Sequence, residues 1–264
     1  MGKKEVFFNQ LNDFFDHIYV IHLKRSTDRK SYIKDKLAGL NFELFRGVDG
    51  KKLDRTELKK KGLYDSHLTK LFKKRKGQPA KDLPLTRIGC ALSHNSVYKD
   101  ILENGYKRAL ILEDDVIVNT KALDIFPKAV NELPKEWELL YFGHWGANSN
   151  PSPILKIQKF LLSLAAIIFE RFERLKMINQ DVIRCWFSRP YSKNLEKSGV
   201  HHGMYAYALT EEGARTILNY QTPVIQEVDN AVAELCNYEW INAFSLKKRP
   251  FYPNLELPST INEE

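Results

Sequence analysis

The sequence predicts an α/β fold, in which a mainly parallel sheet is flanked by helices. The chain opens with a strand, a helix and a second strand, and short apolar strands then alternate with amphipathic helices as far as residue 142. Hydrophobic residues make up 43% of the chain and charged residues 28%, which is ordinary globular usage. A chain of 264 residues fits one large domain.

The opening unit covers residues 18–45. Residues 18–23 are rich in β-branched and aromatic side chains and predict a buried strand. Ser26 or Thr27 then caps a helix that we expect to run to about Leu40. Residues 42–45 alternate in polarity and predict the second strand, which gives the β-α-β unit of a parallel sheet.

Alternation continues through the middle of the chain. Residues 88–103 predict a helix that ends at Asn104-Gly105, and residues 108–112 predict a short apolar strand. A helix over about 121–133 and a strand over 138–142 follow.

The last third begins with a turn-rich break at residues 148–153 and a long helical pattern over 154–178. We expect this helix to pack on the domain; an interfacial membrane helix and a partner surface are the alternatives. A strand over 205–209, a helix opened by Thr210 and a helix over 230–237 come next. We expect the proline-containing tail that follows to be extended and irregular. The domain prediction is therefore a single domain over 1–264, with a helical insertion at about 150–190.

The net charge of +8 comes from one segment. Residues 51–87 hold 13 Lys or Arg and 4 Asp or Glu, which is +9, so the rest of the chain sums to −1. Such a surface attracts nucleic acid, anionic lipid headgroups or an anionic glycan, although a charge-rich solvated surface explains it equally well.

Cysteine usage argues against a disulfide framework and against a structural zinc site. Cys90, Cys185 and Cys236 lie far apart, are odd in number and form no CxxC pair. A reducing, cytoplasmic setting is the expectation. The first 16 residues lack the apolar region of a signal peptide, and the most apolar run, residues 160–169, is too short to span a bilayer.

Three consecutive carboxylates, Glu113, Asp114 and Asp115, directly follow the strand over 108–112. Ligands bind at strand ends in open α/β sheets, and clustered anions repel one another unless a cation offsets them. Mg²⁺ or Mn²⁺ prefers such hard oxygen ligands and could hold a diphosphate. An acidic loop that caps the next helix is the simpler alternative.

A nuclease also combines clustered carboxylates with a basic surface, and Asp49, Asp229 and Glu227 could complete a two-metal site. Spacing alone therefore leaves a metal-dependent phosphodiesterase open. The sequence contains no GxxxxGK[ST] loop, no GxGxxG after the first strand and no GxSxG elbow. These absences argue against nucleotide hydrolysis, the common dinucleotide fold and α/β-hydrolase chemistry.

Four segments, in their order and spacing, resemble glycosyltransferase family 25, the bacterial lipooligosaccharide galactosyltransferases related to the collagen galactosyltransferases. They are residues 18–29, residues 45–50, GCALSH at 89–94 followed by EDD at 113–115, and residues 203–209 with Val228-Asp229. The third is the most specific. The family usually has Asn where this chain has His22, and residues 154–188 have no counterpart, which leaves sugar and acceptor specificity open.

The resemblance implies a GT-A-type, Rossmann-like fold and transfer of a hexose, typically galactose from UDP-galactose, onto a glycan with inversion. It implies Mn²⁺ or Mg²⁺ on Asp115 and Glu113, which would stabilise the UDP leaving group. Asp229 is the expected base for the acceptor hydroxyl, with Glu227 as the second choice.

The remaining site candidates are nucleotide-sugar ligands and acceptor contacts. Arg25 and Arg29 follow the first strand and could hold phosphate, Asp49 could bond the uridine or ribose, and Asp114 could help to hold the metal or the ribose. Ser93 and His94 are expected on a helix that faces the acidic loop, and His201 and His202 on the acceptor side. Cys90 and Trp145 are interpreted as packing residues.

The expected partners are a UDP-sugar donor and a lipid-linked glycan acceptor, with no nucleic acid. The basic segment and the 154–178 helix together predict peripheral contact with an anionic membrane, on the cytoplasmic side of a bacterial inner membrane. Besides the phosphodiesterase, a non-catalytic glycan- or lipid-binding module is the other function that we keep open.

Overall fold

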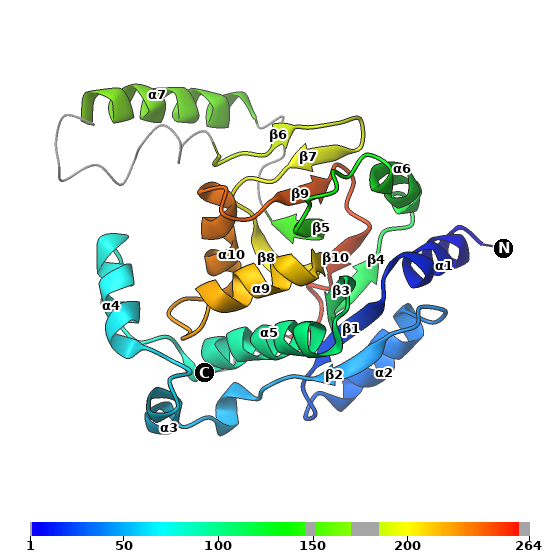
Figure 1. Ribbon diagram of the computed structural model, residues 1–264, viewed down its shortest axis with the longest axis horizontal. Helices are drawn as coiled ribbons and strands as arrows, with labels where there is room; N and C mark the ends of the chain where they lie inside the picture. Colours follow the sequence, from blue (N-terminus) through cyan, green and yellow to red (C-terminus); the bar gives the residue numbers. More distant parts are fainter. Residues whose placement is uncertain (1, 146–151, 170–184, 259–264) are drawn as a thin grey trace.

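The computed structural model describes residues 2–145, 152–169 and 185–258, and its centre is an eight-stranded sheet with the order β2-β1-β3-β8-β5-β9-β7-β6 (Figure 1). The strands of this sheet are β1 His17–His22, β2 Glu43–Arg46, β3 Arg108–Glu113, β5 Leu139–Trp145, β6 Arg189–Pro190, β7 Leu195–Lys197, β8 His202–Thr210 and β9 Ala243–Leu246. A two-stranded sheet pairs β4 Val116–Val118 with β10 Phe251–Pro253.

The main sheet is mixed, and six of its eight strands run in one direction. Strand β1 pairs in parallel with β2 and β3, and β5 pairs in parallel with β9. Strand β8 is antiparallel to both of its neighbours, and β7 is antiparallel to β9 and β6. The predicted α/β class with a mainly parallel sheet is confirmed, and the arrangement is that of a Rossmann-like GT-A fold.

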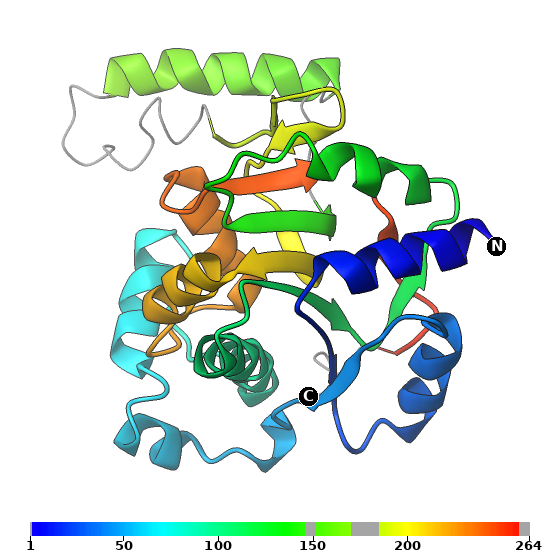
Figure 2. The same cartoon turned by 45° about the vertical axis from the view of Figure 1, so that its right-hand side comes forward.

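Helices cover both faces of the sheet. One face carries α5, α9 and α10, and the other carries α1, α2 and α6 (Figure 2). The helices are α1 Lys3–Phe14, α2 Thr27–Lys36, α3 Arg55–Lys60, α4 Ser66–Arg75, α5 Leu85–Asn104, α6 Phe126–Val130, α7 Pro153–Phe169, α9 Glu211–Tyr220 and α10 Val228–Asn237, with short 3₁₀ turns η1 Gly50–Lys52 and η2 Leu123–Ile125.

The apolar strands supply both cores because their side chains alternate between the two faces. In β3, Leu110 and Leu112 belong to the core under α1 and α2, whereas Ala109 and Ile111 belong to the core under α5. All four side chains are fully buried. Burial on both faces explains why this strand reads as a continuous apolar run in the sequence.

The structure differs from the sequence-based expectations in three places. The helix expected over 121–133 is reduced to η2 and α6, and the residues before it form strand β4. The tail is extended as expected, but it is not irregular throughout, because the backbone of residues 251–253 forms β10 and completes a two-stranded sheet with β4. Helix α1, which buries Phe7, Phe8 and Leu11, was not predicted at all.

The long helix predicted from residue 154 is observed as α7, and residues 170–178 of that prediction lie outside the described residues. Packing on the domain was the expectation, but its described apolar side chains are largely exposed to solvent: Ile154 by 68%, Ile157 by 59% and Phe160 by 62%. Among the described helices, none combines the length and the apolar character needed to cross a bilayer.

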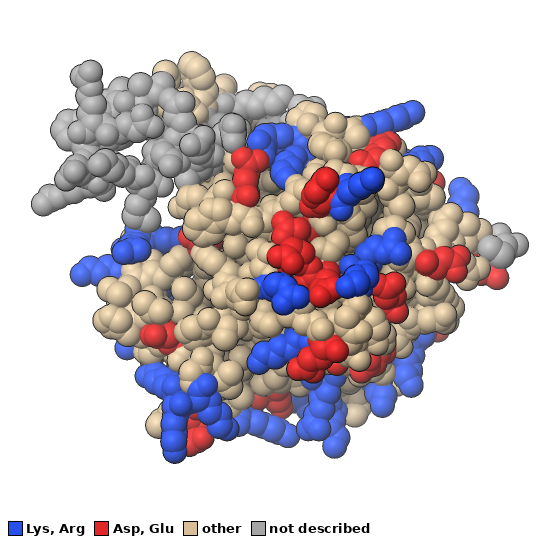
Figure 3. Space-filling view, in the orientation of Figure 1, with Lys and Arg blue, Asp and Glu red and all other residues tan. Residues whose placement is uncertain are grey.

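The basic segment 51–87 folds as η1, α3, α4 and the first turn of α5. Lys and Arg side chains gather over α3 and α4 in the lower left of the space-filling view (Figure 3). Some of these charges are paired within the segment, since Asp82 lies 3.7 Å from Lys70 and 4.0 Å from Arg55. The segment is therefore a folded, basic face of the domain.

Candidate functional site

A cavity of about 190 Å³ opens at the ends of the neighbouring parallel strands β1 and β3. Residues just beyond β1 and β2 form two of its walls, and the first half of α5 forms the third. Its lining residues are Ile21, Leu23, Arg25, Arg29, Val48, Gly50, Thr86, Cys90, Ser93, His94, Glu113, Asp114, Asp115 and Leu257. Strand ends of an open α/β sheet are the usual place for a ligand.

Most of the predicted nucleotide-sugar and metal ligands meet in this cavity, although they come from three separate segments of the chain. They are Arg25, Arg29, Ser93, His94, Glu113, Asp114 and Asp115. Asp49 is not one of the lining residues, but its Oδ1 atom is 3.3 Å from Nε of Arg25, which is.

The three acidic residues have different environments. Glu113 is the last residue of β3, and Asp114 is a buried residue in the turn that follows. Asp114 accepts a hydrogen bond of 2.7 Å from Arg29 and pairs with His22 Nδ1 at 2.7 Å. Both carboxylate oxygens of Asp114 are thus engaged by protein groups, so its observed role is to anchor Arg29 beside the cavity.

Asp115 has spare coordinating capacity. Its Oδ2 atom accepts a hydrogen bond of 3.2 Å from Arg29, whereas Oδ1 is buried and has no hydrogen-bond partner among the described residues. Burial, followed by the negative charge of Glu113, raises the pKa of Asp115 to about 7, although Arg29 opposes this shift. A divalent cation would offset the crowded negative charge, so these residues fit a hard metal ion.

Arg25, Asp49 and Ser93 have structural partners. Ser93 Oγ donates to Gly89 O at 2.7 Å and accepts from the backbone amide of Val48 at 2.8 Å, which ties the loop after β2 to α5. Asp49 caps η1 and pairs with Arg25. These residues shape the cavity wall whether or not they also contact a ligand.

Two glycines allow the loop after β2 to lie directly against α5. A Cβ atom on Gly89 would come within 2.8 Å of the Gly50 backbone, and one on Gly50 within 2.4 Å of Thr86 Cα. Both distances are far below ordinary contact between carbon atoms. The glycines therefore set how closely two walls of the cavity approach.

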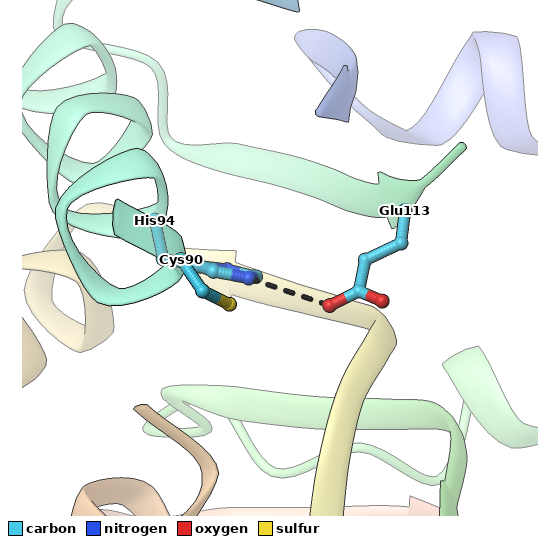
Figure 4. Close-up of side chains that lie close together, drawn as sticks. All are labelled: Cys90, His94 and Glu113. Carbon is cyan, nitrogen blue, oxygen red and sulfur yellow. Dashed lines mark ion pairs between the residues drawn. The ribbon is translucent and has the colours of Figure 1, made fainter. Parts of the chain in front are cut away.

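Cys90 and His94 lie four residues apart on α5 and point toward Glu113 at the end of β3 (Figure 4). His94 Nε2 lies 3.6 Å from Glu113 Oε1, and His94 Nδ1 lies 2.7 Å from the Tyr207 hydroxyl. Burial, and then the charge of Glu113, raises the pKa of Cys90 well above its ordinary value. The interpretation of Cys90 as a simple packing residue is incomplete, because it lines the cavity.

The two candidate bases lie at the start of α10, outside the cavity lining. Asp229 is in the first turn of that helix and its Oδ1 accepts from the Asn230 amide at 2.8 Å. Glu227 accepts from the Asn230 side chain at 2.6 Å and lies 3.6 Å from Arg87. The charges of both carboxylates contribute to the raised pKa of Cys90, after burial and the charge of Glu113, so both lie within electrostatic reach of a residue that lines the cavity.

His201 and His202 have contrasting positions. His201 is fully buried, pairs with Ser188 at 2.9 Å and stacks on His144 with ring centroids 3.6 Å apart. His202 is exposed at the start of β8, opposite Trp145 of β5. A fully buried ring presents no surface to an acceptor, so of the two only His202 is accessible; a role on the acceptor side stays a prediction.

Sequence reasoning missed three contributors to the site. His22 pairs with Asp114, and its only signal was the departure from the asparagine usual in the resembling family. Tyr207, buried in the middle of β8, holds His94. The tail reaches the cavity through Leu257, and the Pro258 carbonyl accepts a hydrogen bond from Arg29 at 2.6 Å. No sequence motif in the tail indicated these contacts.

Comparison with known proteins gives a family match over most of the chain. Residues 15–232 match the family described as Glycosyltransferase family 25 (LPS biosynthesis protein). Similar proteins include procollagen galactosyltransferase 2 of Mus musculus, 32% identical over 136 residues, and a glycosyltransferase 25 family member of Anopheles gambiae, 32% identical over 135 residues.

The matched parts are 49% and 48% of this chain and 21% of each relative, so the chain spans about a fifth of the length of these relatives. The family match itself covers residues from just before β1 to the middle of α10, which includes the cavity walls and the acidic triplet. The chain belongs to glycosyltransferase family 25.

Proposed function

We propose that this protein is a metal-dependent, inverting hexosyltransferase that moves galactose from UDP-galactose onto a lipooligosaccharide, lipopolysaccharide or other surface glycan. Family membership supports sugar transfer, and the name of the similar mouse protein, procollagen galactosyltransferase 2, supports galactose as the sugar. One structural observation supports the metal requirement: within the part of the chain that the structure describes, a buried oxygen of Asp115 has no hydrogen-bond partner, and it lies beside Glu113 in a strand-end cavity that two arginines also line.

In this proposal, the anionic side chains of the cavity bind the metal and the cationic side chains bind the phosphates. Asp115 and Glu113 would hold Mn²⁺ or Mg²⁺, which supplies positive charge to offset the charge that develops on departing UDP. Arg25 and Arg29 place guanidinium groups in the same cavity, where they can donate hydrogen bonds to phosphate oxygens. Asp114 and His22 keep Arg29 in place, which limits its reorganisation when the nucleotide binds.

Inversion requires a base on the acceptor side of the sugar. Asp229 fits this role better than Glu227, because Glu227 is engaged by Arg87 and Asn230. Asp229 Oδ2 accepts a long hydrogen bond of 3.4 Å from the Gly203 amide, and a carboxylate oxygen has a second lone pair that can accept from an acceptor hydroxyl. In the proposed step, that carboxylate takes the hydroxyl proton while the acceptor oxygen attacks the anomeric carbon and UDP leaves.

The decisive experiment is a calorimetric titration of UDP into the protein with Mn²⁺ and then with EDTA. We expect binding that requires the metal and that weakens at least tenfold in Asp115→Asn, which has the same shape but no charge. Asp124→Ala is the matched control, because Asp124 is an exposed carboxylate that pairs with Lys128 on another part of the surface.

Transfer of galactose from UDP-galactose to a purified lipooligosaccharide would complete the assignment. UDP binding that persists in EDTA would overturn the metal requirement, and no UDP binding under any condition would overturn the transferase assignment. In the latter case, cleavage of a phosphodiester substrate would favour the nuclease alternative. Glycan binding without turnover by any donor would favour the binding module.

We further propose that the protein works at a membrane, on a lipid-linked acceptor at the cytoplasmic face of the inner membrane. Helix α7, at the top of Figure 1, exposes apolar side chains to solvent, which could insert into a bilayer. The basic face formed by α3 and α4 supplies a second attraction, through charge (Figure 3). Peripheral binding generally needs two such weak signals, because one alone is marginal.

Cosedimentation with vesicles tests this docking. We expect binding to vesicles of phosphatidylglycerol and phosphatidylcholine, weakened by salt and by the double variant Ile157→Ser/Phe160→Ser. Trp240→Ser is the control, because Trp240 is 58% exposed and lies outside α7. Equal binding of both variants would contradict a role for α7.

A further inference from the structure

Three side chains of different chemistry converge at the inner end of the cavity: the Cys90 thiol, the His94 imidazole and the Glu113 carboxylate. Sγ, one ring nitrogen and one carboxylate oxygen all lie within 4.8 Å of one another (Figure 4). The first two side chains come from successive turns of α5, so the helix fixes their spacing. Glu113 comes from the end of β3, so the cluster joins a helix to the sheet.

The imidazole is oriented by a buried hydrogen-bond chain. His94 is 1% exposed, its Nδ1 atom is 2.7 Å from the Tyr207 hydroxyl, and that hydroxyl is 2.9 Å from the Tyr98 hydroxyl. This places Nε2 toward Glu113. A histidine whose second nitrogen is held by a partner in this way is the usual arrangement in metal sites, because the partner fixes the ring and its tautomer.

The dimensions suit a small tetrahedral ion. In a zinc site with bonds of about 2.0 Å, two nitrogen or oxygen ligands lie roughly 3.3 Å apart. The observed His94–Glu113 separation is 3.6 Å. Thiolate bonds are longer, at about 2.3 Å, so a sulfur ligand of the same ion lies roughly 3.5 Å from its neighbours. All three ligand atoms already lie within 4.8 Å of one another, so side-chain rotations of about an ångström would bring them around one ion.

We propose that Cys90, His94 and Glu113 form a binding site for Zn²⁺, with the fourth position open to the cavity. The sulfur ligand distinguishes this site from the all-oxygen site proposed around Asp115, because thiolate selects zinc over Mg²⁺ and Mn²⁺. On binding, the Cys90 S–H bond is replaced by an S–Zn bond, and the proton leaves to the solvent.

Shared use of Glu113 gives this site a consequence for the enzyme. If Glu113 also holds the metal that supports UDP, zinc withdraws that carboxylate and acts as an inhibitor. This consequence rests on the proposed function, whereas zinc binding itself does not.

Zinc binding is tested on the full chain without nucleotide, by competition with a chromogenic zinc chelator and with a phosphine as the reductant. We expect one Zn²⁺ per chain and an affinity at least tenfold lower in Cys90→Ser. The matched control is Cys236→Ser, because Cys236 is a buried free thiol outside the cluster. Thermal melts establish that both variants fold.

The absorption spectrum of the Co²⁺-substituted protein provides a second test, which a change in packing alone would not affect. With Co²⁺ in place of zinc, a thiolate ligand gives a sulfur-to-cobalt charge-transfer absorption in the near ultraviolet. We expect this band in the wild type and in Cys236→Ser, and its loss in Cys90→Ser. No stoichiometric zinc, equal zinc affinity in the two variants, or no charge-transfer band in the wild type would each overturn the site.

The inhibitory consequence has its own arm, in which Zn²⁺ is added to the UDP titration in Mn²⁺. Weaker UDP binding supports competition for Glu113, and unchanged binding overturns the competition while the zinc site stands. If UDP fails to bind in Mn²⁺ alone, the proposed function fails, and the zinc site is judged by the chelator and cobalt results.

Discussion

Replacing Gly89 with alanine changes the stability of the protein through two opposing effects, helix propensity and steric overlap. Gly89 lies inside helix α5, where alanine is intrinsically more favourable than glycine by about 1 kcal/mol. If helix propensity decided the outcome, Gly89→Ala would therefore stabilise the protein. The packing of α5 against the loop after β2 predicts the opposite sign.

The added Cβ atom would lie 2.8 Å from both Cα and N of Gly50, and 2.9 Å from the Val48 carbonyl oxygen. Carbon atoms in contact prefer about 3.5 Å or more, so the loop would have to retreat by roughly 0.7 Å. The obstructing atoms are backbone and cannot rotate away, and Ser93 holds the same loop by its hydrogen bond to Val48. Overpacking of this kind costs up to about 3 kcal/mol.

Setting about 3 kcal/mol of overpacking against about 1 kcal/mol of helix propensity leaves a net loss of about 2 kcal/mol. For a chain of this size, that loss lowers Tm by roughly 4–8 °C. Thermal unfolding followed by circular dichroism measures the change, with Gly2→Ala as the control, since no atom lies within 4 Å of its added Cβ. A Gly89→Ala protein as stable as the wild type, or more stable, would refute the argument.

Two further predictions concern buried charge. Burial lowers the pKa of His201 from 6.5 to about 3, and it lowers the pKa of His144 well below 6.5. Between pH 6.5 and the lowered pKa, the unfolded chain therefore binds more protons than the native state, and the free energy of unfolding falls as pH falls. At pH 5 the free energy of unfolding lost through His201 is roughly 2 kcal/mol. Urea unfolding at pH 5 and pH 7.5 measures this loss, and the difference in unfolding free energy between the two pH values should be smaller in His201→Asn. It should be unchanged in the control His202→Asn, because the His202 ring is exposed. Arg29→Met should cost about 3 kcal/mol in the same assay, because it removes a buried partner of Asp114, and a loss below about 1 kcal/mol would show that this ion pair is not important for stability.

The α/β class and most of the central strands were predictable because buried strands and capped helices leave local signals. The run over β3 is apolar on both faces, and Gly105 ends α5 in the left-handed conformation expected of a helix-terminal glycine. Strands β4 and β10 were missed because three-residue strands are formed by pairing across more than 130 residues of sequence, which no local pattern records.

The sequence predicted most of the residues that line the cavity, but not which of them pair with one another. The rule that ligands bind at strand ends placed the acidic triplet near Arg29. It did not show that both oxygens of Asp114 pair with Arg29 and His22, or that Asp115 Oδ1 has no partner among residues 2–145, 152–169 and 185–258. Likewise, GCALSH was recognised as a motif, but its glycine acts through a contact with Gly50 and its cysteine through proximity to Glu113. Such roles depend on distances between segments, and these appear only in three dimensions.

The position of β8 has a consequence for how the chain folds during synthesis. This strand lies between β3 and β5 and pairs with both, although it is made long after them. At translation rates of about 5–20 residues per second, the edge of β3, whose central residues 109–112 are all apolar, waits on the order of ten seconds for its partner. An unpaired apolar edge invites association with other chains, so nascent or truncated products that end before β8 are the forms of this protein most prone to aggregate and most in need of a chaperone.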